Sequence, residues 1–294
     1  MSDIKELIGN SLQTELTWCE SHKAEAYDSG WRTDPFLVVI IPLDEPYLLR
    51  VANKDEKGKK IAVQPGEMLI VPPGTRHALT ADECTIRGIN VKYRLFGGID
   101  LLSFFEIPFK LDGTAVDTCL DLLDALIKIS GRRSTIYPVP RVDIDNAFEL
   151  TYVVAERSLL LQLLVLILEH SEPASSTQQR MTSLGKIQPA LDLIHDDLLE
   201  PCSIMELANA CGLSERHFRL VFKRAVGTAP HQYRLSKRIE RAMAMLAMGD
   251  ESITEIAKRL NFFDQSHFTK TFKLQCGLSP RSYQKNLRRK LTKT

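Results

Sequence analysis

The chain has 294 residues, of which 44% are hydrophobic and 26% are charged, a composition typical of a soluble globular protein with room for two domains. Its six cysteines are scattered, without a C-x-x-C pair. This pattern argues against a disulfide framework or a zinc site and favours reduced thiols in a cytoplasmic protein.

Charge is distributed unevenly along the chain. Residues 186–294 carry 19 Lys and Arg against 11 Asp and Glu, a net charge of +8, whereas residues 1–185 carry 19 against 26, a net charge of −7. This asymmetry suggests that the C-terminal part meets a polyanion. A solvated basic surface without a partner would have the same composition, so charge alone does not decide between the two.

Neither a signal peptide nor a membrane span is expected. The N-terminal stretch MSDIKELIGN lacks a basic region followed by an apolar core, which secretory signals have. The longest apolar run, LLLQLLVLIL at 159–168, is flanked by charged residues and reaches only about half the length of a membrane span. It therefore indicates a buried helix.

The N-terminal part is predicted to contain strands and then helices. Five short β-rich runs lie between residues 31 and 95, namely PFLVVII, PYLLRV, KIAV, EMLIV and CTIRGINVKY. Between about 114 and 170 the apolar spacing becomes helical, first in TAVDTCLDLLDALIKI and then in NAFELTYVVAERSLLLQLLVLILEH. The second run is apolar on most of its circumference and so should be covered on most sides. The polar stretch 171–186, rich in Ser and Thr, is typical of an interdomain linker.

A duplicated unit dominates the C-terminal part. SERHFRLVFKRAVGTAPHQY at 214–233 and DQSHFTKTFKLQCGLSPRSY at 264–283 match at a fixed offset of 50 residues. The identical pairs are His217/His267, Phe218/Phe268, Phe222/Phe272, Lys223/Lys273, Gly227/Gly277, Pro230/Pro280 and Tyr233/Tyr283.

Each copy reads as a helix, a tight turn and a second helix. Ser203-x-x-Glu206 and Ser252-x-x-Glu255 are capping-box patterns, and Ser214 and Asp264 suit N-caps of the two repeated helices. Gly212 and Asn261 occupy the turns, where a positive φ is often required. A helix from about 230 to 248, ended by Gly249, would connect the copies. Its 19 residues span roughly 28 Å, close to the ~34 Å between successive major-groove faces of DNA.

Residues 187–289 resemble the DNA-binding domain of the AraC/XylS family of bacterial transcription regulators. The stretch ITEIAKRLNFFDQSHFTKTFKLQCGLSPRSY keeps the I-x-x-I-A opening, the S-x-F core of the recognition helix, the F-K pair and the G-x-S-P-x-x-Y close. Two positions depart from the family pattern: Asn261 replaces the usual Gly, and Ala229 in GTAP replaces a capping Ser. The resemblance implies two recognition helices that enter consecutive major grooves of double-stranded DNA.

Contacts with DNA are assigned by position in this resemblance. Arg, Gln and Thr side chains can read base edges, whereas Lys residues late in each helix suit phosphate. Leu220 takes a place where relatives often have a polar reader. A lone His in each copy suits packing or phosphate contact better than metal binding, because neither has a second ligand. The base-contacting candidates are Arg216, Arg219, Gln265, Ser266, Thr269 and Lys270, and the phosphate-contacting candidates are Lys223, Lys273, His217 and His267. Arg238 and Arg241 on the connecting helix are expected to be solvated or ion-paired.

The stretch PGEMLIVPPGTRHAL at 65–79 resembles the second conserved motif of cupin β-barrels, which AraC-type regulators often carry as a sensor domain. Gly66 and Gly74 suit barrel turns, and His77 is either a pocket hydrogen-bonding group or a satisfied barrel residue. We expect the barrel to hold a small-molecule effector, an acid clamped by arginines or a carbohydrate stacked on Trp31, with a mild preference for the carbohydrate from the resemblance. The candidate pocket residues are Trp31, Arg50, His77, Arg87, Asn90 and Tyr93.

The sequence predicts an α+β protein with four regions. These are a cupin-like effector-binding barrel at 1–110, helices packed on it at 111–170 with a dimerisation seam, a linker at 171–186, and a double helix-turn-helix domain at 187–294. The predicted function is a cytoplasmic, effector-responsive transcription regulator and activator, a homodimer that contacts RNA polymerase and needs no cofactor. A metal-dependent cupin enzyme is the alternative, but residues 31–65 contain no His, and catalytic cupins need clustered ligands. The other alternative is a DNA-binding protein that does not respond to small molecules.

Overall fold

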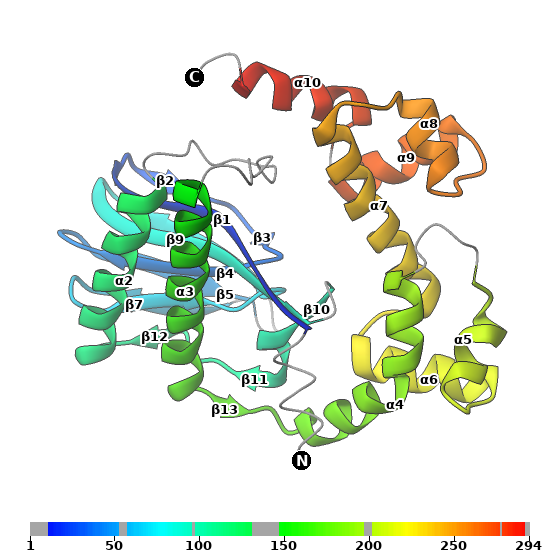
Figure 1. Cartoon of the computed structure of the whole chain (residues 1–294). Helices are drawn as coiled ribbons and strands as arrows, with labels where there is room; N and C mark the ends of the chain where they lie inside the picture. The colour runs from blue at the N-terminus through cyan, green and yellow to red at the C-terminus, as the bar shows by residue number, and fades with distance from the viewer. Residues whose placement is uncertain are drawn as a thin grey trace.

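The computed structural model describes residues 11–52, 58–95, 98–130, 147–196, 202–276 and 278–291. An N-terminal part of antiparallel sheets and two helices is followed by an all-helical C-terminal part (Figure 1). The predicted α+β fold class is confirmed. Gly277 and the segment 131–146 of the predicted helical region lie outside the described residues.

Two antiparallel sheets make up the N-terminal part. The first has the order β1-β9-β4-β7-β12, with β10 also paired to β9, and the second has the order β2-β8-β5-β6, with β3 paired to β8. The two sheets share no strand, so the barrel is not closed. The strands of the first sheet are β1 (Leu12–Ala24), β4 (Leu37–Pro42), β7 (Met68–Val71), β9 (Cys84–Leu95), β10 (Ile99–Asp100) and β12 (Lys110–Leu111); those of the second are β2 (Tyr27–Asp28), β3 (Arg32–Thr33), β5 (Tyr47–Val51), β6 (Lys59–Val63) and β8 (Arg76–Ala81).

All five predicted strand runs form strands, and β1 is an additional one that pairs with β9 along its length. The chain passes repeatedly from one sheet to the other, and the turns before and after β7 contain Gly66 and Gly74 with φ of 86° and 76°. These are left-handed values that glycine adopts freely, as the motif at 65–79 predicted.

The first sheet is the middle of three layers. Alternate residues of β4 point to opposite faces: Leu37, Val39 and Ile41 belong to the apolar cluster shared with the helices, whereas Val38 and Ile40 belong to the cluster shared with the second sheet. Burial on both faces explains why β4 is an uninterrupted apolar run.

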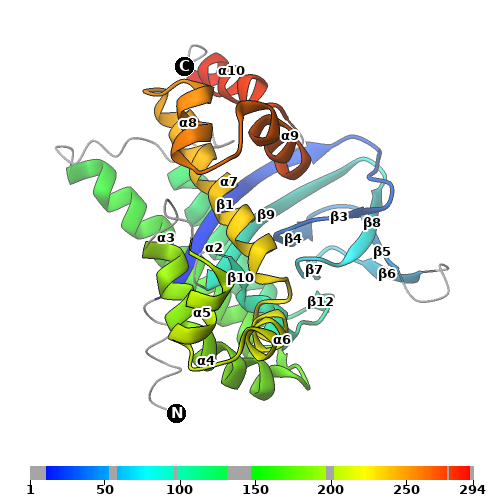
Figure 2. The same cartoon turned by 90° about the vertical axis from the view of Figure 1, so that its right-hand side faces the viewer.

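Helices α2 (Thr114–Ser130) and α3 (Ala147–Glu169) cover the outer face of the first sheet (Figures 1 and 2). α3 packs on α2 and β1, and Arg157 donates to the carbonyl oxygen of Leu12 at 3.1 Å. Within the described residues, Leu150–Glu169 is one helix long and apolar enough to span a membrane by length and composition. Its opposite face leaves Leu150, Val154 and Val165 more than half exposed.

The polar stretch predicted as a linker is mostly helical. After a short pair of strands, β11 (Phe105–Glu106) with β13 (Glu172–Pro173), and the 3-10 turn η1 (Leu101–Phe104), helix α4 runs from Thr177 to Asp196. The prediction overlooked a helical stripe of apolar side chains that begins inside this stretch. Its buried members are Met181, Leu184, Ile187, Ala190, Leu191 and Ile194. They belong to one apolar cluster that extends from the space between the first sheet and its helices to residues 207–233 of the C-terminal part, whereas the buried apolar side chains of residues 239–283 form a separate cluster. The division between domains near residue 187 remains a prediction.

Six further helices complete the C-terminal part within the described residues. They are α5 (Ile204–Ala210), α6 (Glu215–Val226), α7 (Pro230–Met248), α8 (Ile253–Arg259), α9 (Gln265–Cys276) and α10 (Pro280–Leu291). Both predicted capping boxes are present, at Ser203 with Glu206 and at Ser252 with Glu255. Ala229 caps α7 without a side-chain bond, whereas Ser279 accepts a bond from the Ser282 N–H at 3.1 Å.

Candidate nucleic-acid interface

The two helix-turn-helix units, α5–α6 and α8–α9, have the same turn geometry. Gly212 and Asn261 take φ values of 64° and 54°, the left-handed values predicted for them. The N–H of the next residue in each turn donates to the carbonyl oxygen of an alanine in the first helix. Leu213 donates to Ala208 at 2.9 Å, and Phe262 donates to Ala257 at 3.0 Å. These bonds turn the chain tightly into the second helix of each unit.

Each second helix begins at a side-chain cap and buries an aromatic stripe. Ser214 accepts from the His217 N–H at 3.4 Å, and Asp264 accepts from the His267 N–H at 2.6 Å. The four predicted core aromatics, Phe218, Phe222, Phe268 and Phe272, are fully buried. The opposite face of each helix is therefore turned outward.

The outward face of α6 is basic but partly self-paired. Arg216 is exposed, and the Arg219 guanidinium lies 3.0 Å from the Glu215 carboxylate one turn earlier. Leu220 is 61% exposed. Lys223 and His217 are exposed on the same helix, so every candidate on α6 can be reached from solvent.

The outward face of α9 is polar. Gln265, Ser266, Lys270 and Lys273 are exposed and Thr269 is half-buried. The Thr254 hydroxyl of α8 donates to the Gln265 side-chain oxygen at 2.8 Å. This bond fixes the amide of Gln265 at the start of the helix.

His267 lies with its ring edge-on to Phe262, at 5.6 Å between ring centres. Across the described residues, no group of three or more His, Cys, Asp or Glu side chains is arranged to hold a metal ion.

The connecting helix α7 holds both units through two arginines that are one turn apart. Arg234 donates to the carbonyl oxygen of Cys202, just before α5. Arg238 donates to the carbonyl oxygen of Asn261 at 3.2 Å and lies over the Phe262 ring, 5.4 Å from its centre. The sequence predicted a solvated or ion-paired Arg238. Its role in the second turn was not predicted, because a backbone oxygen and an aromatic ring are uncharged partners that give no signal in the distribution of charged residues.

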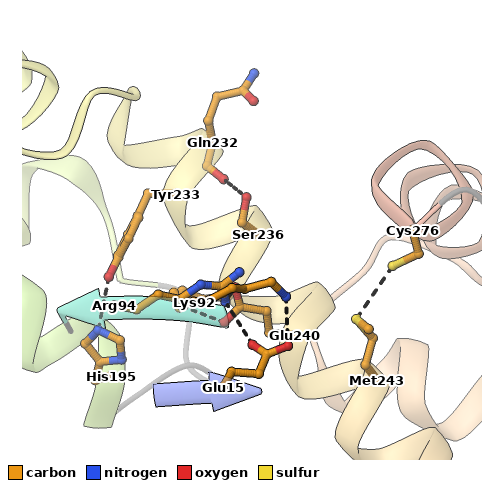
Figure 3. A network of polar contacts seen from close by, with 11 residues as sticks. Glu15, Lys92, Arg94, His195, Gln232, Tyr233, Ser236, Glu240, Met243 and Cys276 are labelled. Atoms are coloured by element: carbon orange, nitrogen blue, oxygen red, sulfur yellow. Dashed lines mark hydrogen bonds and ion pairs between the residues drawn. The ribbon is translucent and has the colours of Figure 1, made fainter. Parts of the chain in front are cut away.

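A polar cluster joins α7 to the first sheet, as Figure 3 shows. The Glu240 carboxylate of α7 forms ion pairs with the Arg94 guanidinium of β9 at 3.1 Å and with the Lys237 ammonium at 2.5 Å. The Glu15 carboxylate of β1 forms an ion pair with Lys92 at 2.7 Å. The lysines are almost fully buried. Burial lowers the pKa of Lys237 and of Lys92, and the neighbouring glutamates oppose that shift.

The candidate effector residues do not share one cavity. Tyr93 is buried against α3, where its hydroxyl donates to the Leu160 carbonyl oxygen at 2.7 Å, and Arg87 pairs with Asp124 of α2 at 2.9 Å. Both therefore face the helices. Asn90 alternates to the opposite face, toward the second sheet, and its side-chain oxygen is buried without a hydrogen bond.

The remaining candidates belong to the second sheet. His77 is fully buried, its Nδ1–H donates to the Thr75 carbonyl oxygen at 2.9 Å, and its Nε2 lies 3.5 Å from Asp34. Both ring nitrogens of His77 thus lie within 3.5 Å of oxygen atoms of the protein, and a role of His77 toward an effector stays a prediction.

Trp31 and Arg50 lie together on the outer face of the second sheet. The Arg50 guanidinium sits over the Trp31 ring, 5.7 Å from its centre, and lies 3.5 Å from Asp28. An open groove runs alongside. It is lined by Tyr27, Asp28, Tyr47, Leu48, Thr80 and Asp82, among others.

Comparison with known proteins agrees with this geometry. Residues 207–286 match the helix-turn-helix domain family. The chain is 34% identical over 101 residues to the uncharacterized HTH-type transcriptional regulator YidL of Escherichia coli, covering 34% of each chain. It is 33% identical over 134 residues to the HTH-type transcriptional activator RhaS of Klebsiella pneumoniae, covering 45% of this chain and 46% of RhaS.

Among solved structures, an AraC-type transcriptional regulator from Chromobacterium violaceum is 29% identical, with a TM-score of 0.35 over 36% of this chain and 95% of that chain. The matches thus span less than half of the length of YidL and RhaS. Residues 207–286 therefore contain a helix-turn-helix domain of the AraC type, similar to the one in RhaS.

Proposed function

We propose that this protein is a sequence-specific DNA-binding regulator of transcription that responds to a small molecule. The main support is that two helix-turn-helix units on one connecting helix bury their aromatic cores and turn their polar faces outward. α7 contributes 19 residues, roughly 28 Å of rod, which suits successive grooves of one DNA face.

The test is selection of duplexes from a random pool by the full chain, followed by titration of variants on the selected site. Arg219→Ala and Gln265→Ala should each cost ~1–3 kcal/mol and relax preference at single base pairs. Lys273→Ala should weaken all sequences alike and reduce the salt dependence. An identical, sequence-independent loss for Arg219→Ala and Lys273→Ala would contradict this division of roles.

For the effector, the outer face of the second sheet has the most suitable chemistry. Trp31 offers a ring for stacking, Arg50 a cation, and Tyr27, Asp28 and Thr80 offer hydrogen-bonding groups along an open groove. Aromatic faces with hydroxyl and carboxylate groups suit a carbohydrate, and Arg50 would suit an acid. Our proposal is a carbohydrate effector.

A thermal-shift screen of sugars and organic acids tests this proposal. The ligand found should no longer raise the unfolding temperature of Trp31→Ala, whereas Leu193→Ala, at an exposed position of α4 outside both sheets, should keep the response. Failure of every ligand to shift the wild-type protein would favour a DNA-binding protein that works without an effector.

A homodimer is part of the same proposal. α3 is apolar around its circumference, yet Leu150, Val154 and Val165 are more than half exposed; a helix of this kind is normally covered on all sides. Val154→Lys combined with Val165→Lys should convert a dimer to a monomer in analytical ultracentrifugation. Gln162→Lys, also exposed on α3, should leave the dimer intact.

Transcription activation requires contact with RNA polymerase in addition to DNA. In vitro transcription from a promoter that carries the selected site would test it, with a rise in transcript expected on addition of the protein and effector. A fall in transcript would instead indicate a repressor.

A further inference from the structure

The turn of the second helix-turn-helix unit contains one residue more than the turn of the first. Equivalent positions up to and including the tight turn are 49 residues apart, but the N-caps that follow are 50 apart. Because the same backbone bonds close both turns, the additional residue must lie between the turn and the cap. The pairs at the first offset are Ser203/Ser252, Ala208/Ala257, Gly212/Asn261 and Leu213/Phe262, and the caps are Ser214/Asp264.

The additional residue is Phe263, and its side chain is 93% exposed. The neighbouring Phe262 is 7% exposed and fills the core of the unit, so the second ring serves no packing role in this structure. Single apolar side chains do occur on protein surfaces. Phe263, however, directly precedes the cap of a recognition helix, at the end of the helix that enters the major groove in this class of domain.

We propose that Phe263 packs against the 5-methyl group of a thymine in the major groove and makes the second unit select a T·A pair beside the base read by Gln265. This proposal rests on the proposed DNA-binding function. A phenyl ring has no charge with which to bind a phosphate group, and the adjacent Asp264 carboxylate would repel a phosphate. The thymine methyl is the apolar group that base edges present in the major groove, and phenylalanine is among the side chains that contact it.

Hydrogen bonds hold the residues next to Phe263 in the sequence. Asp264 is fixed by its bond to the His267 N–H at 2.6 Å, and Gln265 by its bond from Thr254 at 2.8 Å. The two residues that follow Phe263 are therefore held at the start of α9. The first unit has no residue at the corresponding place, so the preference should be confined to one half of the binding site.

The test measures the affinity of the full chain for its selected duplex after single thymine-to-deoxyuridine replacements, each of which removes only the methyl group. At one thymine in the half-site of α9, the wild-type protein should lose about fourfold in affinity. Phe263→Ser should bind the parent duplex about tenfold more weakly than wild type and should not distinguish thymine from deoxyuridine there. Phe263→Leu should retain part of the discrimination.

Leu274→Ser is the matched control, because Leu274 is 86% exposed but lies at the far end of α9. It should discriminate between thymine and deoxyuridine as the wild type does. Equal thymine discrimination by wild type and Phe263→Ser, or a selected half-site without thymine, would overturn the assignment of Phe263 while leaving the DNA-binding function in place. Failure of the wild-type chain to select any duplex would overturn both.

Discussion

Arg94 of the first sheet and Glu240 of the connecting helix lie 3.1 Å apart, and this pair crosses from the N-terminal part of the chain to the C-terminal part. Glu240 also holds Lys237, whose side chain is only 4% exposed. The contact connects the N-terminal part directly to α7, the helix that links the two helix-turn-helix units. An effector can act through this contact only if it binds two arrangements of the parts with different affinity.

Because Lys237 is buried, substitutions of Arg94 and Glu240 should lower the free energy of unfolding by different amounts. Arg94 is about one-quarter exposed, so Arg94→Ala should lower the free energy of unfolding by less than ~1 kcal/mol. Glu240→Ala should cost about 2 kcal/mol, because it takes the nearest carboxylate from a buried ammonium group. In a Lys237→Met background, the cost of Glu240→Ala should fall below ~1 kcal/mol. Urea unfolding of the wild type, the three single variants and the double variant measures these costs, and equal costs of Glu240→Ala in both backgrounds would refute the explanation.

Gly98 lies where the N-terminal part packs tightly against α7, with no room for a larger side chain. A Cβ atom at this position would lie 2.6 Å from the Tyr233 ring and 2.8 Å from the Lys237 side chain, closer than carbon atoms pack. Gly98→Ala should therefore separate α7 from the first sheet and speed limited proteolysis between the parts.

Gly185, inside α4, is the control for this substitution because a Cβ atom there would meet nothing within 4 Å. Gly185→Ala should stabilise the helix by up to about 1 kcal/mol without any change in proteolysis. Unchanged cleavage in Gly98→Ala would show that the parts are not held together at this point in solution.

Asp100 predicts a pH-dependent effect on stability. Burial raises the pKa of this carboxyl from 3.8 to about 6, while its bond from the Leu102 N–H and the charge of Arg94 act in the opposite direction. Because the folded-state pKa is raised, the stability that protonation confers is fully present below about pH 4 and is lost as the pH rises through 6. Asp100→Asn should thus stabilise the fold by about 1–2 kcal/mol at pH 7, since Asn caps a helix as well as Asp. Thermal unfolding between pH 4 and 8 should show this advantage disappearing toward pH 4; a constant difference would contradict it.

The pair between Glu215 and Arg219 predicts a gain in DNA binding. Arg219 has to leave Glu215, 3.0 Å away, before it can donate both bonds to a base. Glu215→Gln should therefore strengthen binding to the selected site several-fold, by removing an acidic group from the groove-facing surface and by releasing the guanidinium. Titration by fluorescence anisotropy measures the change. If Glu215→Gln also strengthened binding of an Arg219→Ala protein by the same factor, release of the guanidinium would play no part.

Local sequence signals predicted the C-terminal part in detail, because caps, left-handed turn positions and aromatic spacing act within a few residues. Gly212, Asn261, Ser203 and Ser252 all take the conformations or bonds that their residue types favour. The first helix of this part was the exception, since its polar surface concealed a buried stripe.

Contacts between distant residues were not predictable in the same way. The side chains proposed for one pocket separate because strand alternation and sheet pairing decide which face each occupies, and a register fixes that face only once partners are known. Tyr93 thus packs against α3, while Arg50 lies on the outer face of the second sheet. The link between Arg94 and Glu240 joins positions 146 residues apart and has no local signature.

The most direct test of the central claim is the spacing of protein contacts along the selected duplex. Hydroxyl-radical footprinting of the full chain should show two protected segments about one helical turn apart on one face. Arg216→Ala with Arg219→Ala should remove only one segment, and Gln265→Ala with Thr269→Ala only the other. Insertion of five base pairs between the segments should abolish tight binding, because α7 holds the two units at a fixed separation. A single protected segment, or binding that tolerates the five-base-pair insertion, would contradict the claim that both helices read consecutive grooves.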